Sequence, residues 1–153
     1  MRRTEIQRLA RAIRQADDEL TANNRQLTEI VNRITPQLLQ RRGIGPVSAA
    51  QVIVSFSHPG RCRNDGAFAS LAGSCPIPAS SGRTRRWRLN RGGDRALNRA
   101  LHTIAVSRMT SCPCTRDYAD RRRGEGKSNA EIRRCLKRYI SREIFRLLNT
   151  QMA

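Results

Sequence analysis

Aromatic residues make up only 4% of this chain of 153 residues, and acidic residues number only 12. A surface that recognises bases by stacking them on aromatic rings is therefore not expected. The acidic residues are scattered, so they do not form the cluster of carboxylates that a magnesium-dependent nuclease or phosphotransferase needs. We expect no metal site and no cofactor within this chain.

The sequence also lacks a cysteine framework and a long apolar run. Its five cysteines include no Cys-x-x-Cys pair, which disfavours a disulfide scaffold and a zinc site. The longest mostly apolar stretch, Ala49 to Phe56, is too short to cross a bilayer. The N-terminus begins as a polar helix and not as an apolar signal core. These features predict a cytoplasmic protein with no membrane partner.

Positive charge is what the sequence has in excess. Lys and Arg total 30, the formal net charge is +18, and only Lys127 and Lys137 are lysines. A chain this basic is expected to act on a polyanion, and arginine binds phosphate oxygens in pairs where lysine is a point charge. A coding bias towards arginine explains the same composition, so the positions of the arginines are more informative than their number.

An amphipathic helix is predicted from residue 6 to residue 34. Its apolar residues are spaced three and four apart in a heptad pattern, with Asn23 at the one polar position: Ile6, Leu9, Ile13, Ala16, Leu20, Leu27, Ile30 and Ile34. The pattern predicts a coiled coil over residues 1–35 and a homodimer formed through residues 6–34. The alternative is that the apolar side packs on the chain's own core. Pro36 is expected to end the helix.

A helix-hairpin-helix is predicted over residues 38–56. A short helix ends at Gly43 and Gly45, and a second helix begins with Pro46 in its first turn. In this DNA-binding element, a glycine turn presents backbone N–H groups to a phosphate, and a Cβ would block the close approach. Gly43 and Gly45 are therefore candidate nucleic-acid-binding residues. An ordinary turn between two helices is the alternative.

The densest basic segment, residues 80–95, is predicted to form a strand pair or an extended arm. Arginines interleaved with polar residues and one tryptophan are typical of a segment that lies on a nucleic-acid backbone. The candidate phosphate-binding residues are Arg83, Arg85, Arg86, Arg88, Arg91 and Arg95. Ser80 or Ser81, just before Gly82, is a candidate nucleophile because guanidinium groups would stabilise charge on an attacked phosphate. A plain Ser-Ser-Gly turn is the alternative.

Further helices are predicted in the rest of the chain. A short one is expected from about Gly66 to Ala72, and one from about 94 to 109 begins after Asp94 as its N-cap. The last, about 128–149, begins with a capping box of Ser128 and Glu131. Its apolar side is predicted to contain Ile132, Cys135, Leu136, Tyr139, Ile140, Ile144, Leu147 and Leu148, and its basic side Arg133, Arg134, Lys137, Arg138 and Arg142.

These patterns predict a mainly α fold. We expect an N-terminal heptad helix followed by a compact helical domain over residues 36–153, which includes the helix-hairpin-helix and a short basic β-like or extended arm.

Several blocks of the sequence, in order, resemble one family. They are the Gly43-Ile44-Gly45-Pro46 turn, the run from Ala72 to Arg83, the runs Arg88 to Arg95 and Leu97 to Leu101, and Glu125-Gly126-Lys127 followed by Arg133 to Tyr139. Together they extend from about Leu38 to Leu148. They are similar to the C-terminal transposase domain of the bridge-RNA-guided insertion-sequence recombinases, the DEDD-plus-serine family of transposable elements.

The resemblance implies DNA transposition and recombination through a phosphoserine link. Ser81 matches the family's nucleophile, with Ser80 as the adjacent alternative, and the implied partners are DNA and a guide (bridge) RNA. The family holds magnesium in a RuvC-like N-terminal domain that has no counterpart in this sequence. We therefore expect a truncated or partial transposase that does not act alone. The alternative is a non-catalytic dimeric nucleic-acid-binding module.

Overall fold

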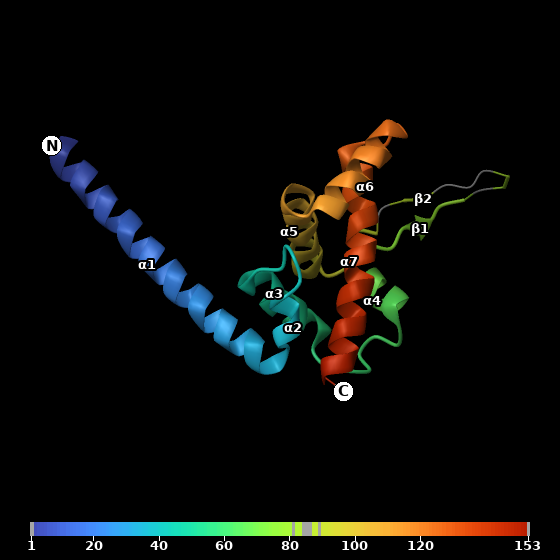
Figure 1. Ribbon diagram of the computed structural model, residues 1–153, viewed down its shortest axis with the longest axis horizontal. Coiled ribbons are helices and arrows are strands. Elements are labelled where there is room, and N and C mark those ends of the chain that lie inside the picture. Colours follow the sequence, from blue (N-terminus) through green and yellow to red (C-terminus); the bar gives the residue numbers. More distant parts are fainter. Residues whose placement is uncertain (1, 81, 84–86, 89, 153) are drawn as a thin grey trace.

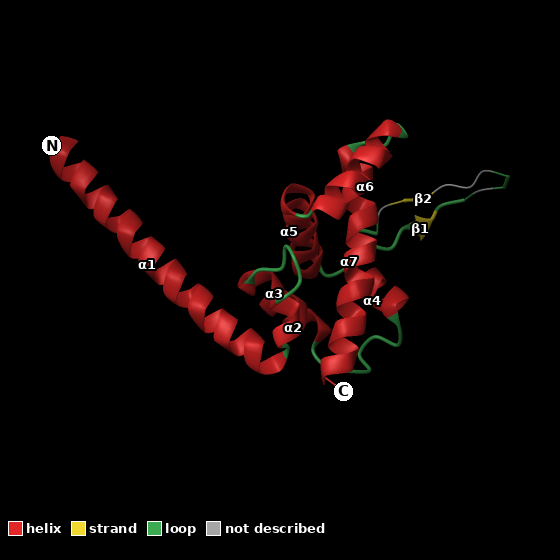
Figure 2. Ribbon diagram, viewed as in Figure 1, coloured by secondary structure: helices red, strands yellow, loops and turns green. Residues whose placement is uncertain are grey.

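The computed structural model describes residues 2–80, 82–83, 87–88 and 90–152. These residues form a mainly helical fold, as predicted (Figure 2). The helices are α1 (Arg2–Ile34), α2 (Pro36–Leu39), α3 (Pro46–Phe56), α4 (Asp65–Leu71), α5 (Arg95–Ser111), α6 (Pro113–Gly124) and α7 (Asn129–Met152). Two short strands, β1 (Ile77–Pro78) and β2 (Trp87–Arg88), lie between α4 and α5.

The predicted N-terminal helix is confirmed as α1, which projects away from the other helices (Figure 1). Only its C-terminal end, where Val31 is fully buried, packs against α2 and α3. Ile13 and Leu20 are 61% and 60% exposed. The alternative that the heptad residues pack on the chain's own core is therefore wrong for most of the helix.

The core lies among α3, α4, α5 and α7 (Figure 1). Its largest side chains form an aromatic cluster in which the ring centroids of Phe56, Phe68 and Phe145 lie 5.9–6.2 Å apart. Edge-on and tilted ring contacts of this kind add to the stabilisation that burial alone provides. The cluster joins α3, α4 and α7, which come from distant parts of the sequence.

Two predicted helix caps are confirmed. The Asp94 carboxylate accepts hydrogen bonds from the backbone N–H groups of Ala96 and Leu97 at 2.8 and 3.0 Å. At the start of α7, the Glu131 carboxylate accepts from the Ser128 backbone N–H, and the Ser128 hydroxyl accepts from the Glu131 N–H. These bonds satisfy backbone donors that have no partner within a helix.

The structure corrects the predicted faces of α7. Tyr139 is 58% exposed and not part of the core, whereas Phe145, absent from the predicted apolar side, is buried. Lys137, predicted on the basic outer side, is only 9% exposed because α7 packs against α5 there. Its amine donates a hydrogen bond to the Asn98 side-chain oxygen at 2.9 Å.

Helix α6 was not predicted by the sequence pattern. The helix predicted from about 94 to 109 is α5, which ends at Ser111. Pro113 then occupies the first turn of α6, where a missing N–H costs no intrahelical hydrogen bond.

Candidate nucleic-acid interface

The strands β1 and β2 pair antiparallel beside α7 (Figure 1). Strand β2 lies within the predicted basic arm, residues 80–95, and β1 lies just before it. Ile77 pairs with Arg88 and Pro78 with Trp87. The side chains of Ser80, Arg83 and Arg88 are exposed. Ser81, Arg85 and Arg86, the other predicted nucleophile and phosphate contacts of this arm, lie outside the described residues.

A close contact between two glycines fixes the return of the arm to the helical body. A Cβ on Gly93 would lie 2.5 Å from the Gly73 backbone nitrogen and 2.7 Å from the Leu71 carbonyl oxygen. Gly73 has a φ of +61°, a conformation that favours glycine. The Asp94 backbone N–H also donates to the Leu71 carbonyl at 2.7 Å. The segment that follows α4 and the segment that precedes α5 therefore lie side by side.

Polar side chains add hydrogen bonds at this end of the arm. The Asn98 amide donates to the Ala72 carbonyl at 2.6 Å, and the Ser55 hydroxyl donates to the Asp94 carboxylate at 2.7 Å. The Ser55 bond, together with the backbone N–H groups of Leu97 and Ala96, lowers the pKa of Asp94. Helices α3 and α5 are thus joined at the point where the arm ends.

A cavity of about 740 Å³ lies between the base of the arm and α7. Trp87 and Arg88 of β2 form part of one wall, and the N-terminal half of α7 contributes much of the rest. Its lining includes six cationic side chains: Arg88, Arg122, Lys127, Arg134, Lys137 and Arg138. This concentration of positive charge beside the arm is suited to bind phosphate groups.

A second basic cavity, of about 490 Å³, also borders Gly73 and Gly93. Arg91, Arg95 and His102 contribute to its lining. Burial and the nearby positive charges of Lys137 and Arg133 lower the pKa of His102. The predicted phosphate contacts Arg88, Arg91 and Arg95 are thus divided between two cavities at the base of the arm.

The glycine turn predicted as a helix-hairpin-helix lies elsewhere, between α2 and α3. Gly43 has a φ of +76°, and a Cβ there would lie 2.9 Å from the Arg108 Cγ. The Arg108 guanidinium donates to the Arg42 carbonyl at 2.8 Å, so this turn packs against α5. Gly45 is the N-cap residue of α3, and a Cβ there would meet no atom within 4 Å.

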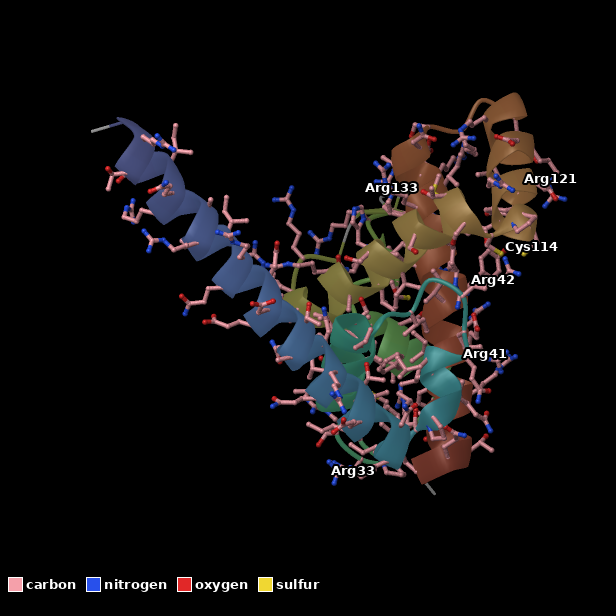
Figure 3. The ribbon with its side chains drawn as sticks, turned by 60° about the vertical axis from the view of Figure 1, so that its left-hand side comes forward. Arg33, Arg41, Arg42, Cys114, Arg121 and Arg133 are labelled. Atoms are coloured by element: carbon pink, nitrogen blue, oxygen red, sulfur yellow. The ribbon has the colours of Figure 1, made fainter. Side chains whose placement is uncertain are left out.

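The described cysteines are all free thiols. Cys112 and Cys114 lie at the start of α6 with their Sγ atoms 3.1 Å apart. Hydrogen bonds from Thr115 and Cys114 and the positive charge of Arg42 lower the pKa of Cys112 to about 7. Figure 3 shows Arg42 and Cys114 on the same side of the molecule.

Within the described part of the chain, no group of three His, Cys, Asp or Glu side chains is arranged to hold a metal ion. These described residues therefore do not provide the carboxylate cluster of a magnesium centre. None of the helices described is both long enough and apolar enough to cross a membrane.

Sequence reasoning did not anticipate that α7 and the arm share a cavity. The signal was present in part, because Arg134 and Arg138 are four residues apart and so lie on one side of a helix. What the sequence did not show is that Arg122 and Lys127, before α7, border the same cavity. That convergence depends on how α6 packs against α7.

Comparison with known proteins defines the class of this basic helical chain, which is that of insertion-element transposases. Residues 36–120, more than half of the chain, match the family described as "Transposase IS116/IS110/IS902 family". The chain belongs to this family. It is 31% identical over 116 residues to the insertion element IS110 uncharacterized 43.6 kDa protein of Streptomyces coelicolor. The match covers 75% of this chain and 29% of that relative.

Proposed function

We propose that this chain is the DNA-binding, serine-bearing domain of an insertion-sequence transposase. It takes part in DNA transposition and recombination through a phosphoserine link. The observation that carries the proposal is the family match over residues 36–120, which includes Ser80, Ser81 and the basic arm. The high positive charge supports it as well, since a polyanionic substrate screens the self-repulsion of such a chain.

In the proposed reaction, the Ser81 hydroxyl oxygen attacks the phosphorus of a DNA phosphodiester. A bond between Ser81 Oγ and phosphorus forms while the bond from phosphorus to the leaving strand breaks. The serine loses its proton, and the leaving oxygen gains one. Arg83, Arg85, Arg86 and Arg88 hold the backbone and stabilise the charge that develops on the phosphate.

The described residues do not fit a magnesium site, so no step of this reaction is assigned to a metal held by them. The Streptomyces relative is longer, and the match covers 29% of it. We propose that a carboxylate-bearing domain, in the same or another polypeptide, supplies the magnesium. A bridge RNA as partner belongs to the same proposal and is supported by the resemblance of the motifs.

Gly43, Gly45 and the start of α3 are a second proposed DNA contact. Support comes from the N-cap of α3, where Gly45 provides no side-chain cap and leaves backbone N–H groups for a phosphate. The role of Gly43 also includes packing, because its turn lies against Arg108. Arg91 and Arg95 would contact the backbone at the base of the arm.

Trapping a covalent protein–DNA complex tests the proposed chemistry. End-labelled insertion-element DNA is incubated with the chain and an acidic-domain polypeptide of the family, and a denaturing gel detects the labelled adduct. Ser81→Ala is expected to abolish the adduct, and Ser80→Ala, the matched control, to retain it. An adduct or joined strands with Ser81→Ala would show that Ser81 is not the nucleophile.

A non-catalytic dimeric nucleic-acid-binding module is the second candidate function. The observation that favours it is α1, whose heptad residues from Ile6 to Leu20 are exposed and suited to pair with a second copy. Under this alternative the chain binds DNA, and neither wild type nor serine variants give an adduct. The homodimer through residues 6–34 is compatible with both functions.

A further inference from the structure

The cavity between β2 and α7 contains a buried cation, Lys137, that forms no ion pair with a described residue. Lys137 is 9% exposed, and among the described residues no carboxylate lies within 4.0 Å of its amine. Its described partner is the neutral oxygen of Asn98. Burial and the charge of Arg134 lower the pKa of Lys137. A buried cation is destabilising unless an anion compensates it, so the cavity favours an anionic ligand.

Other side chains at this cavity extend the anion site. Arg134 and Arg138 are exposed and lie one helical turn apart on α7, on either side of Lys137 in the sequence. Arg88 approaches from β2. Glu131, the carboxylate in the lining, is already held by the Ser128 backbone N–H and hydroxyl. Guanidinium groups placed in this way bind phosphate oxygens in pairs.

The other wall of the cavity offers a surface for a base. Trp87, the one tryptophan of the chain, is 65% exposed and borders the cavity. Pro76, Ile132 and Cys135 add further nonpolar atoms to the lining. The low aromatic content excludes a surface that stacks several bases in a row. One exposed tryptophan still provides a stacking position for a single base. A cavity of about 740 Å³ is of the size that holds a small ligand and cannot enclose a stacked duplex.

We propose that this cavity binds an unpaired nucleotide of single-stranded DNA, with the phosphate at Lys137, Arg134 and Arg138 and the base against Trp87. The inference rests on the proposed function and deepens it, because it assigns the DNA a site on α7 in addition to the serine of the arm. A strand that has been separated or nicked during transposition presents this chemistry.

Fluorescence of Trp87 tests the proposal directly, because no other tryptophan contributes to the signal. A short oligothymidylate is titrated into the full chain at low salt. We expect it to quench the fluorescence, and the double variant Arg134→Gln/Arg138→Gln to bind about tenfold or more weakly. The matched control is Arg146→Gln, which removes an exposed arginine near the other end of α7. This control is expected to bind like the wild type.

Two further ligands distinguish the parts of the site. A single strand with abasic positions is expected to bind with little quenching, and a duplex of equal length to quench less than oligothymidylate. Unchanged affinity of the double variant, equal quenching by the duplex, or tighter binding of oligouridylate would overturn the proposal. Lys137→Met is tested as well, with circular dichroism as a check of folding. If it unfolds, the exposed arginine variants decide the question.

The outcomes separate this inference from the proposed function. If Ser81 is shown not to be the nucleophile, the binding of oligothymidylate and the quenching of Trp87 are expected to be unaffected. Conversely, absence of quenching beside an intact adduct would overturn the α7 site alone.

Discussion

Helices α1 and α7 are both long and amphipathic, with 33 and 24 residues, but their apolar sides have opposite environments. In α7, Ile144 and Leu148 are almost fully buried, whereas Ile13 and Leu20 of α1 are largely exposed. Periodicity therefore predicts a helix and its apolar side without predicting what covers that side.

The polar contacts of the two helices differ in the same way. Side-chain contacts along α1 join residues three or four apart, as in the Arg8–Glu5 ion pair. Helix α7 has such local contacts too, but several of its side chains also reach other helices, as in the ion pair of Glu143 with Arg108 and the bond of Lys137 to Asn98. Local surface ion pairs add little to stability, so α1 depends on what its apolar side contacts.

The largest expected effect is on α7. Replacing Ile144 with Ala removes buried methyl groups and leaves a cavity, which should lower the free energy of unfolding by about 3 kcal/mol. Ile13→Ala in α1, measured at a concentration where the chain is monomeric, should change it by less than about 0.5 kcal/mol. Urea unfolding followed by circular dichroism measures both. Equal losses of unfolding free energy in the two variants would show that the apolar side of α1 is buried within the monomer.

Helix α1 is predicted to pair with a second copy of itself through its exposed heptad residues. Leu20→Asp places a charge in the heptad interface and should raise the dissociation constant of the homodimer by about a hundredfold. The reason is that Leu20 of each copy would be buried in the dimer interface. Thr21→Asp, one position away on the outer side, should leave it unchanged. Sedimentation equilibrium measures both constants. A wild-type chain that remains monomeric at high concentration would contradict the predicted dimer.

Asp94 is expected to contribute less to the free energy of unfolding than Ile144. Asp94→Ala removes the cap of α5 and its bond to Ser55, and should lower the free energy of unfolding by about 1 kcal/mol at neutral pH. Because folding lowers the pKa of Asp94, its contribution is present above its unfolded pKa and is lost as the pH falls through the folded value.

The difference between wild type and Asp94→Ala should therefore shrink below about pH 4. Urea unfolding at several pH values measures it. The control is Asp17→Ala on the exposed surface of α1, which should have little effect at any pH. A constant difference across the pH range would show that the Asp94 charge does not stabilise the fold.

Features set by neighbours in the sequence were predictable, and features set by packing were not. The caps at Asp94 and Ser128 were predicted because each involves residues only two or three positions apart. The burial of Lys137 depends on α5, and that of Phe145 on the aromatic cluster with Phe56 and Phe68, so neither follows from the pattern of α7 alone.

The same distinction applies to the candidate site. The arginines of the arm and the Ser-Ser-Gly step were recognisable from local composition and motif. The cavity was not, because it requires β2, the end of α6 and α7 to meet in space. Helix α6 was not predicted because a proline is typical of a helix end, whereas Pro113 here occupies the first turn of a new helix two residues after α5 ends.

The contact of Gly73 with Gly93 closes the loop between α4 and α5 at its base. Its two ends are fixed to each other by main-chain atoms, so the helices do not depend on the length of the segment between them. The entropy of closing a loop grows only slowly with its length. A change in the length of the segment between Gly73 and Gly93 is therefore expected to cost little free energy while α4 and α5 keep their positions.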